Sequence, residues 1–124
     1  MAKKILIVED DRAICDLLSH VLEMKGFEVL VANTGNDALK IIKKTTPDIA
    51  ILDINLPDIT GWDVLKSMRH NPKCSKVPVL MCTNKNTMID IEQAMSLGAK
   101  GYITKPFDID KIIDKIIAAI EGNL

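Results

Sequence analysis

The amino-acid sequence predicts an α/β protein built from five consecutive β-α units. Short apolar runs of strand length alternate with longer segments in which apolar residues recur at helical spacing. The runs are continuous rather than alternating, which is typical of strands buried on both faces of a parallel sheet. Because crossovers between parallel strands are right-handed, helices then cover both faces, and the usual strand order for five units is 2-1-3-4-5.

Five strands are expected from the apolar runs. Three runs are unbroken: Ile5 to Val8, Ile49 to Leu52 and Val77 to Cys82. Two shorter runs, Phe27 to Val31 and Tyr102 to Ile103, are the second and fifth strands in chain order.

Five helices are expected between and after the strands. Apolar residues at helical spacing mark them: Ile14 to Leu22, Ala38 to Ile42, Val64 to Met68, Ile91 to Met95 and Ile109 to Ile120. Gly26 and Gly98 follow the first and fourth helices, where a C-terminal cap is expected. Thr34 with Asp37 indicates a capping box at the start of the second helix, and Asp108 is the predicted N-cap of the fifth.

Composition limits the possible functions. The chain has 124 residues, the length of one domain, so residues 1–124 are expected to form a single domain. Sixteen Lys and Arg against seventeen Asp and Glu give a net charge of −1, which argues against direct nucleic-acid binding. No apolar run has the roughly 20 residues that a membrane span requires. Cys15, Cys74 and Cys82 show no metal-ligand spacing, which favours a reducing compartment and a cytoplasmic location.

Polar side chains follow four of the expected strands. In chain order they are Glu9, Asp10 and Asp11, then Asp53, Thr83 and Lys105. Because parallel strands end at the same edge of a sheet, Glu9, Asp10 and Asp53 are expected to meet beside the switch point between the first and third strands. Asp11 is expected to point away from them and to help start the first helix.

Converging carboxylates on a rigid sheet edge suit a hard cation that retains water ligands, namely Mg²⁺. The alternative is that these acids only cap helices. That alternative fits Asp11 but not Asp53, because the residues after Asp53, with Asn55 and Pro57 among them, do not begin a helix. A carboxylate can accept a phosphoryl group as an acyl phosphate, and Mg²⁺, a Lys and a Thr hydroxyl would stabilise the product.

The sequence resembles the receiver domain of two-component response regulators, in particular chemotaxis regulators, over nearly its whole length. The matching stretches are Ile5 to Asp11, Leu52 to Pro57 with Gly61, Thr83, and Gly98 to Phe107. This resemblance implies a flavodoxin-like (βα)5 three-layer sandwich with strand order 2-1-3-4-5. It also implies two-component phosphorelay signalling, with a sensor histidine kinase or a phosphotransfer protein as the phosphodonor.

The resemblance assigns a role to each acid of the expected cluster. Asp53 would be the phosphoacceptor, receiving the group from a phosphohistidine. Asp10 and Asp53 would bind Mg²⁺ directly together with the backbone carbonyl of Asn55, while Glu9 would act largely through water. Lys105 would be the cation that stabilises the phosphoryl group, and its peptide bond to Pro106 is cis in the family.

The resemblance further implies a switch. Thr83 and Tyr102 match the residue pair in which a hydroxyl moves toward the phosphoryl group and an aromatic ring turns inward. A downstream protein would then bind the surface of the fourth helix, fifth strand and fifth helix. Asn55 and Lys85, two residues after Asp53 and Thr83, are expected to control how long the phosphoryl group survives.

Two other function classes agree less well with the sequence. A module binding flavin mononucleotide needs a Ser/Thr/Gly-rich phosphate cradle after the first strand, and three acids stand there instead. An aspartyl phosphatase would need a second acid at Asn55, so the chain is expected to assist only its own phosphorylation and dephosphorylation and not to be an enzyme. The sequence ends at Leu124 without an output domain, which favours a free-standing regulator over the receiver part of a longer protein.

Overall fold

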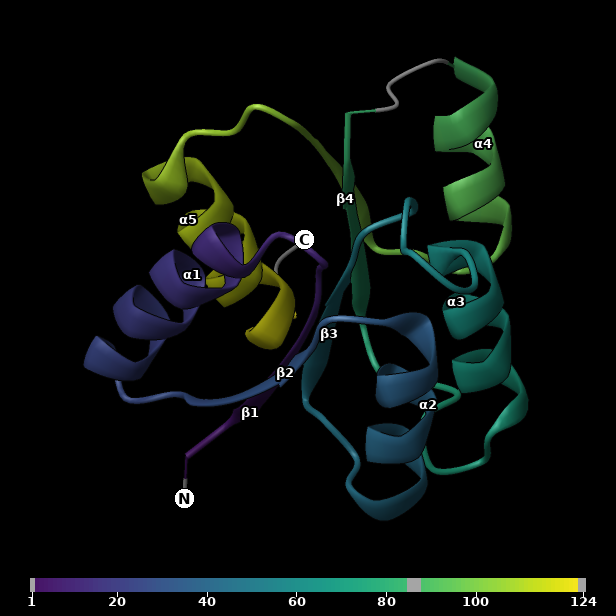
Figure 1. Cartoon of the computed structure of the whole chain (residues 1–124), viewed down its shortest axis with the longest axis horizontal. Helices are drawn as coiled ribbons and strands as arrows, with labels where there is room; N and C mark the ends of the chain where they lie inside the picture. The colour runs from purple at the N-terminus through teal and green to yellow at the C-terminus, as the bar shows by residue number, and fades with distance from the viewer. Residues whose placement is uncertain (1, 85–87, 123–124) are drawn as a thin grey trace.

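The computed structural model describes residues 2–84 and 88–122 and confirms the predicted α/β architecture (Figure 1). The elements in chain order are β1 (Lys4–Val8), α1 (Arg12–Met24), β2 (Glu28–Ala32), α2 (Gly35–Lys44), β3 (Ile49–Leu52), α3 (Gly61–His70), β4 (Val79–Thr83), α4 (Met88–Ser96), β5 (Gly101–Thr104) and α5 (Ile109–Ile120). Every expected strand and helix is therefore present.

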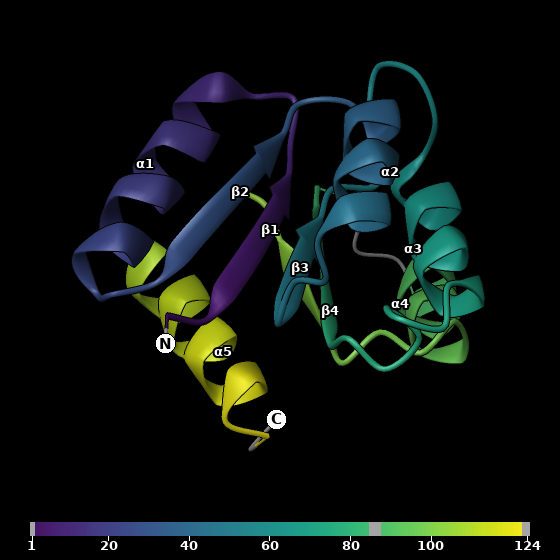
Figure 2. The ribbon, with the colours of Figure 1, turned by 90° about the horizontal axis from the view of Figure 1, so that it is seen from below.

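The sheet has the strand order predicted from the sequence. Its five strands are all parallel in the order β2-β1-β3-β4-β5. Figures 1 and 2 show α1 and α5 on one face and α2, α3 and α4 on the other. β1 lies between β2 and β3, so the chain reverses its direction of travel across the sheet after β2. The two strand ends that flank this switch point are those of β1 and β3.

The two faces of the sheet carry two hydrophobic clusters. Side chains of successive strand residues point to opposite faces. Thus Leu6 and Val8 of β1 pack with α2, α3 and α4, whereas Ile5 and Ile7 pack with α1 and α5. All four side chains are at most 1% exposed, which accounts for the continuous apolar run. A sheet buried on both faces fixes its strand ends rigidly, and these ends carry the polar residues of interest.

The helix caps agree with the sequence patterns in part. Thr34 accepts a hydrogen bond from the Asp37 N–H at 3.0 Å, and Asp108 caps α5 as predicted. The reciprocal capping box, however, is found at Thr60 and Asp63 at the start of α3. The same Thr-x-x-Asp pattern occurs at both places, so spacing alone does not determine which pair closes the second bond.

Strand boundaries differ slightly from those expected. β4 begins two residues after the start of its apolar run, because the Val77 N–H donates to the Cys74 carbonyl and so belongs to the preceding turn. β2 is shifted by one residue, and β5 is one residue longer at each end. Within the described ranges, no helix is both long and apolar enough to cross a bilayer.

Candidate functional site

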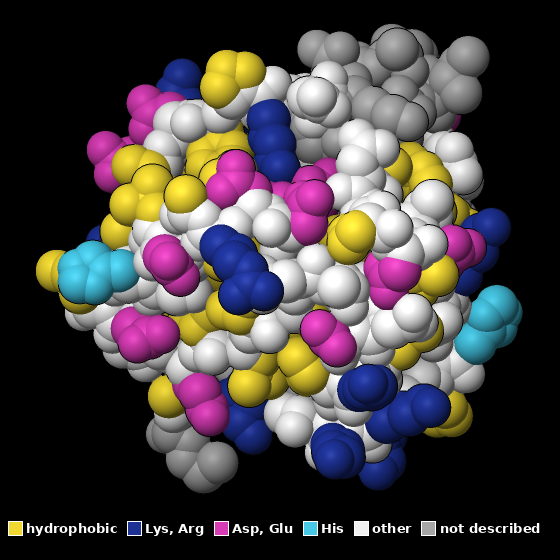
Figure 3. Space-filling view, in the orientation of Figure 1, with side chains coloured by type: hydrophobic (Ala, Val, Ile, Leu, Met, Phe, Trp, Pro, Cys, Tyr) yellow, Lys and Arg dark blue, Asp and Glu magenta, His cyan; other side chains and the backbone are white. Residues whose placement is uncertain are grey.

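The carboxyl ends of β1 and β3 bring three carboxylates together. The register pairs Val8 with Leu52, so the residues that follow these strands are neighbours. The Asp53 N–H donates to the Val8 carbonyl at 3.0 Å, which continues the sheet bonding to the acid itself. Oxygens of Glu9, Asp10 and Asp53 lie within 4.8 Å of one another. Figure 3 shows acidic side chains gathered beside a basic one in the upper half of the view.

Lys105 reaches this cluster from the loop between β5 and α5. Its Nζ donates to Asp53 Oδ2 at 2.9 Å and to Glu9 Oε1. The peptide bond from Lys105 to Pro106 is cis. Within the described residues, Lys105 is the only cation that forms an ion pair with these acids. One positive charge thus faces three carboxylates.

Burial shapes the protonation of the cluster. Glu9 is 4% exposed and Asp53 is 5% exposed. Burial, with the charge of Asp53 adding to it, raises the pKa of Glu9 from 4.5 to about 7, against the opposing bond from Lys105. Burial by itself would lower the pKa of Lys105, but its bonds to Glu9 and Asp53 outweigh this and raise it. The lysine therefore stays charged at neutral pH, where Glu9 is only partly ionised.

Asp11 is separate from the carboxylate cluster and caps α1. Its carboxylate accepts from the backbone N–H groups of Ala13 and Ile14 at 3.0 and 3.3 Å. This confirms the expectation that Asp11 starts the first helix. Its own N–H donates to Glu9 Oε2 at 3.1 Å, so the helix start also orients the Glu9 side chain.

The loop from β3 to α3 closes tightly around Asp53. The Asn55 N–H donates to Asp53 Oδ1 at 3.1 Å, and the Gly61 N–H donates to the Ile54 carbonyl at 2.9 Å. A Cβ on Gly61 would lie 2.1 Å from the Asp53 carbonyl oxygen. Only glycine allows α3 to begin this close to the acid, which explains the presence of Gly61 in the motif.

The cluster fits a hard divalent cation. All its donors are carboxylate oxygens, two of the three acids are buried, and a single lysine leaves their charge incompletely balanced. Mg²⁺ prefers oxygen ligands and keeps several waters, which suits a cluster that retains one exposed acid, Asp10. The donor set thus fits the expected cofactor.

The expected switch residues lie on the neighbouring strands. Thr83 ends β4 and pairs with Thr104, the residue before Lys105. The side chain of Thr83 and the whole of Lys85 lie outside the part of the chain that the structure describes. Tyr102 of β5 is half-buried and packs against the hydrophobic cluster on the face covered by α2, α3 and α4.

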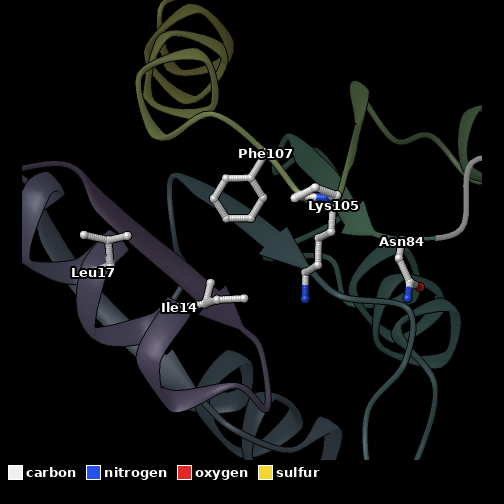
Figure 4. Close-up of a pocket in the computed structure, with 6 residues that line it drawn as sticks. Ile14, Leu17, Asn84, Lys105 and Phe107 are labelled. Carbon is white, nitrogen blue, oxygen red and sulfur yellow. The ribbon is translucent and has the colours of Figure 1, made fainter.

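An apolar cavity of about 500 Å³ opens beside Lys105 (Figure 4). It is lined by Ile14, Leu17, Asn84, Lys105, Pro106 and Phe107. Figure 4 shows the Lys105 side chain extending between Ile14 and Asn84. Leu17 is 51% exposed, although it is one of the apolar residues at helical spacing between Ile14 and Leu22 that predict the first helix. The spacing of apolar residues identifies the apolar face of a helix, but it does not show which residues of that face are covered by neighbouring elements.

Glu9 should make the stability of the metal-free protein depend on pH. Because its pKa is about 7 when folded and near 4.5 when unfolded, the folded state binds more protons between these values. Proton binding by Glu9 therefore stabilises the folded state relative to the unfolded state. We expect the full stabilisation below about pH 4.5 and its loss as the pH rises through 7. Urea unfolding at pH 5, 6 and 7 measures the slope. Glu9→Gln should reduce it, whereas Glu28→Gln, which removes an exposed glutamate on β2, should not. An unchanged slope in Glu9→Gln would contradict the assignment.

Comparison with known proteins identifies the same group of proteins as the motifs do. The family model described as the response regulator receiver domain matches residues 5–117. The structure of the Vibrio cholerae chemotaxis protein CheY4 is similar with a TM-score of 0.89 and 30% identity, covering 94% of this chain and 98% of that one.

Two further solved structures extend the comparison. A CheY-like response regulator receiver domain protein from Methanospirillum hungatei JF-1 has a TM-score of 0.92 and 30% identity, with 99% of this chain and 97% of that chain covered. The signal receiver domain of a signal transduction histidine kinase from Syntrophus aciditrophicus has a TM-score of 0.87 and 27% identity, with 98% and 92% covered. The range that the family model matches, residues 5–117, includes all four strand ends that carry polar residues.

Proposed function

The chain belongs to the family of response regulator receiver domains, and from this premise we propose that it accepts a phosphoryl group on Asp53 in a Mg²⁺-dependent reaction. The observation that carries the proposal is the position of Asp53 between Glu9, Asp10 and Lys105. A buried carboxylate that faces a cation and further oxygen ligands is suited to receive a phosphoryl group. The wider role is two-component phosphorelay signalling.

In the proposed reaction, a carboxylate oxygen of Asp53 attacks the phosphorus of the donor. The bond from phosphorus to the donor nitrogen or oxygen breaks as the new bond to Asp53 forms, and the leaving group departs with the electron pair. Lys105, which already contacts Asp53 Oδ2, would shift to a phosphoryl oxygen and neutralise its charge. The Asn55 N–H holds Asp53 Oδ1 and so fixes the orientation of the carboxylate.

The proposed cofactor is Mg²⁺. Asp10 and Asp53 would hold it directly with the backbone carbonyl of Asn55, and Glu9 would bind it through water. When bound, the ion supplies neutralisation of the negative charge on the transferring phosphoryl oxygens. Catalysis would be confined to the protein's own phosphorylation and dephosphorylation, as is general for signalling domains of this family.

Phosphorylation by a small-molecule donor tests this function. Incubation with acetyl phosphate and Mg²⁺ should add one phosphoryl group to the protein, measured as intact mass. Chelation of Mg²⁺ should suppress the addition, because the transferred charge is then balanced only by Lys105. Equal phosphorylation with and without the metal would contradict the proposed cofactor.

We also propose that the phosphodonor is a histidine kinase or phosphotransfer protein that docks on the apolar cavity beside Lys105. The cavity adjoins the acceptor site, and Leu17 exposes half of its side chain at its wall. Leu17→Gln should reduce the rate of transfer from such a protein about tenfold, since apolar anchors at an interface contribute about 1–2 kcal/mol.

The control for this docking surface uses the same helix. Met24 is 74% exposed on α1 but does not line the cavity, so Met24→Gln should leave transfer unchanged. Phosphorylation of Leu17→Gln by acetyl phosphate should equal that of the unsubstituted protein, because this donor needs no protein contact. A kinase that phosphorylates Leu17→Gln at the full rate would place the docking surface elsewhere.

The downstream response is proposed to pass through Thr83 and Tyr102 to the surface of α4, β5 and α5. In support, Tyr102 lies on β5 and lines a cavity of about 400 Å³ together with residues of α5. The Lys115 Nζ of α5 donates to the Tyr102 carbonyl at 3.3 Å, which ties this helix to the strand. A protein target would sense a change in Tyr102 at this surface.

We further propose that residues 1–124 form one receiver domain that works in the cytoplasm. The three cysteines, Cys15, Cys74 and Cys82, are free and buried, as is common in a reducing compartment. We propose no contact with nucleic acid or membrane, since the net charge of −1 provides no excess of cations for a polyanion.

A further inference from the structure

A side chain outside the carboxylate cluster connects the loop of the phosphoacceptor to another helix. Asp58 lies in the loop between β3 and α3, five residues after Asp53. Its Oδ1 accepts from the Gly35 N–H at 2.8 Å, and its Oδ2 accepts from the Asn36 N–H at 2.9 Å. Gly35 and Asn36 are the first two residues of α2, so one carboxylate joins this loop to the start of that helix.

The bonds from Asp58 complement the cap that α2 already has. Thr34 uses its side-chain oxygen to accept from the Asp37 N–H, which leaves the first two N–H groups of the helix for another acceptor. Asp58 takes both of them. The Asn36 N–H, and then the other backbone N–H groups that face it, lower the pKa of this carboxylate. A charged acceptor at a helix N-terminus is also favoured by the helix dipole.

Packing strengthens the same link. A Cβ on Gly35 would lie 2.2 Å from Ile59 Cγ1, so the loop rests directly on the first turn of α2. At its other end the loop is held by Gly61, which lies against the Asp53 backbone. Asn55 lies in the stretch between Asp53 and Asp58, and its N–H donates to the acceptor carboxylate. Movement of the loop away from α2 would therefore disturb the surroundings of Asp53.

We propose that Asp58 is a positioning residue of the phosphorylation site, which holds the loop against α2 so that Asn55 stays beside Asp53 where Mg²⁺ is bound. This inference rests on the proposed function, since it concerns the metal that the acceptor site would use. α2 is the fixed partner in the link, because Ala38 and Ile42 anchor it in the core. The effect of Asp58 is thus on the geometry of the loop and on the affinity for Mg²⁺.

Asp58→Ala should raise the Mg²⁺ dissociation constant roughly fivefold, through loss of two charge-assisted hydrogen bonds that order the loop. Titration with Mg²⁺ followed by amide NMR of Asp53 to Gly61 measures this without any phosphodonor. Asp58→Asn keeps an acceptor oxygen for one of the two N–H groups and should give an intermediate constant. It also provides a variant with little risk of misfolding.

Two control variants separate positioning from other effects. Thr34→Ala removes the helix's own cap but leaves the bonds of Asp58, so it should lower the stability of α2 and leave Mg²⁺ affinity unchanged. Asp37→Asn removes the same charge from the same helix end and tests long-range electrostatics. It should also leave the affinity unchanged.

Wild-type affinity in Asp58→Ala would overturn the inference, and so would an equal loss in Thr34→Ala or in Asp37→Asn. If the unsubstituted protein itself binds no Mg²⁺, the proposed function fails and the inference with it. These outcomes are distinguishable, because the unsubstituted protein is titrated first. In Asp58→Ala the amide resonances of Gly35 and Asn36 should shift as well, since both N–H groups lose their acceptor.

Discussion

Asp53→Asn should abolish phosphorylation by acetyl phosphate in the presence of Mg²⁺. The amide has nearly the shape of the carboxylate and can still accept the Asn55 N–H, so the loop should keep its conformation. It is not an anionic nucleophile and cannot form an acyl phosphate by displacement at phosphorus. The measurement is the acid-stable, hydroxylamine-labile phosphoryl label on the protein.

The control for this substitution is Asp11→Asn. It removes the same charge from a residue that caps α1 outside the carboxylate cluster, and asparagine is as good an N-cap as aspartate. Labelling of Asp11→Asn should remain close to that of the unsubstituted protein. A label of undiminished intensity in Asp53→Asn would show that another residue is the acceptor.

Asp10→Asn should weaken Mg²⁺ binding about 10- to 100-fold, as expected when a charged oxygen ligand of a metal is replaced by a neutral one. The structure places an Asp10 oxygen within 4.8 Å of those of Glu9 and Asp53. The substitution should cost little or no folding stability, because it also relieves repulsion within the cluster. Calorimetric titration with Mg²⁺ and urea unfolding measure the two quantities.

Asp11→Ala should have the opposite effect. Loss of the α1 cap is expected to lower the free energy of unfolding by about 1 kcal/mol, while Mg²⁺ affinity changes little. The neighbouring acids would thus separate metal binding from helix capping. Equal losses of metal affinity in the Asp10 and Asp11 variants would contradict this division of roles.

Most of the fold could be predicted from the sequence because strands buried on both faces leave a simple signature. The Ile5 to Val8 and Ile49 to Leu52 runs are apolar at every position since both faces are covered. The ends of such apolar runs are less reliable as predictions of where a strand begins or ends. Val77 is apolar and buried, but its N–H donates to the Cys74 carbonyl in the preceding turn, so the strand starts later.

The carboxylate cluster could be predicted because the order and direction of the strands determine which strand ends are neighbours. Once β1 and β3 are parallel neighbours, the residues after Val8 and Leu52 must lie side by side. Lys105 is less constrained, since it lies in a loop, although its place after the fifth strand already suggests a role in stabilising the phosphoryl product, which the family resemblance matches. The bonds from its Nζ to Glu9 and Asp53 are visible only in three dimensions.

Features that depend on contacts between distant segments could not be predicted. Asp58 appears in the sequence as one more acid in a loop, and its bonds to Gly35 and Asn36 require the loop and α2 to be placed first. Leu17 likewise lines a cavity together with Phe107 from the loop after β5, a neighbour that the spacing of apolar residues in α1 does not reveal. The Thr-x-x-Asp pattern of the capping box at Thr60 and Asp63 is visible in the sequence, but the same pattern at Thr34 and Asp37 forms only one of the two bonds, so the pattern alone does not identify the box.

The central claim is that Asp53 becomes an acyl phosphate, and chemical mapping of the modified residue tests it most directly. Borohydride reduces an aspartyl phosphate to homoserine, which peptide mass spectrometry locates to one position. After treatment with acetyl phosphate and Mg²⁺, we predict homoserine at position 53 and none in a sample from which Mg²⁺ has been chelated. Homoserine at Asp10, Asp11 or another acid, with Asp53 unmodified, would contradict the account.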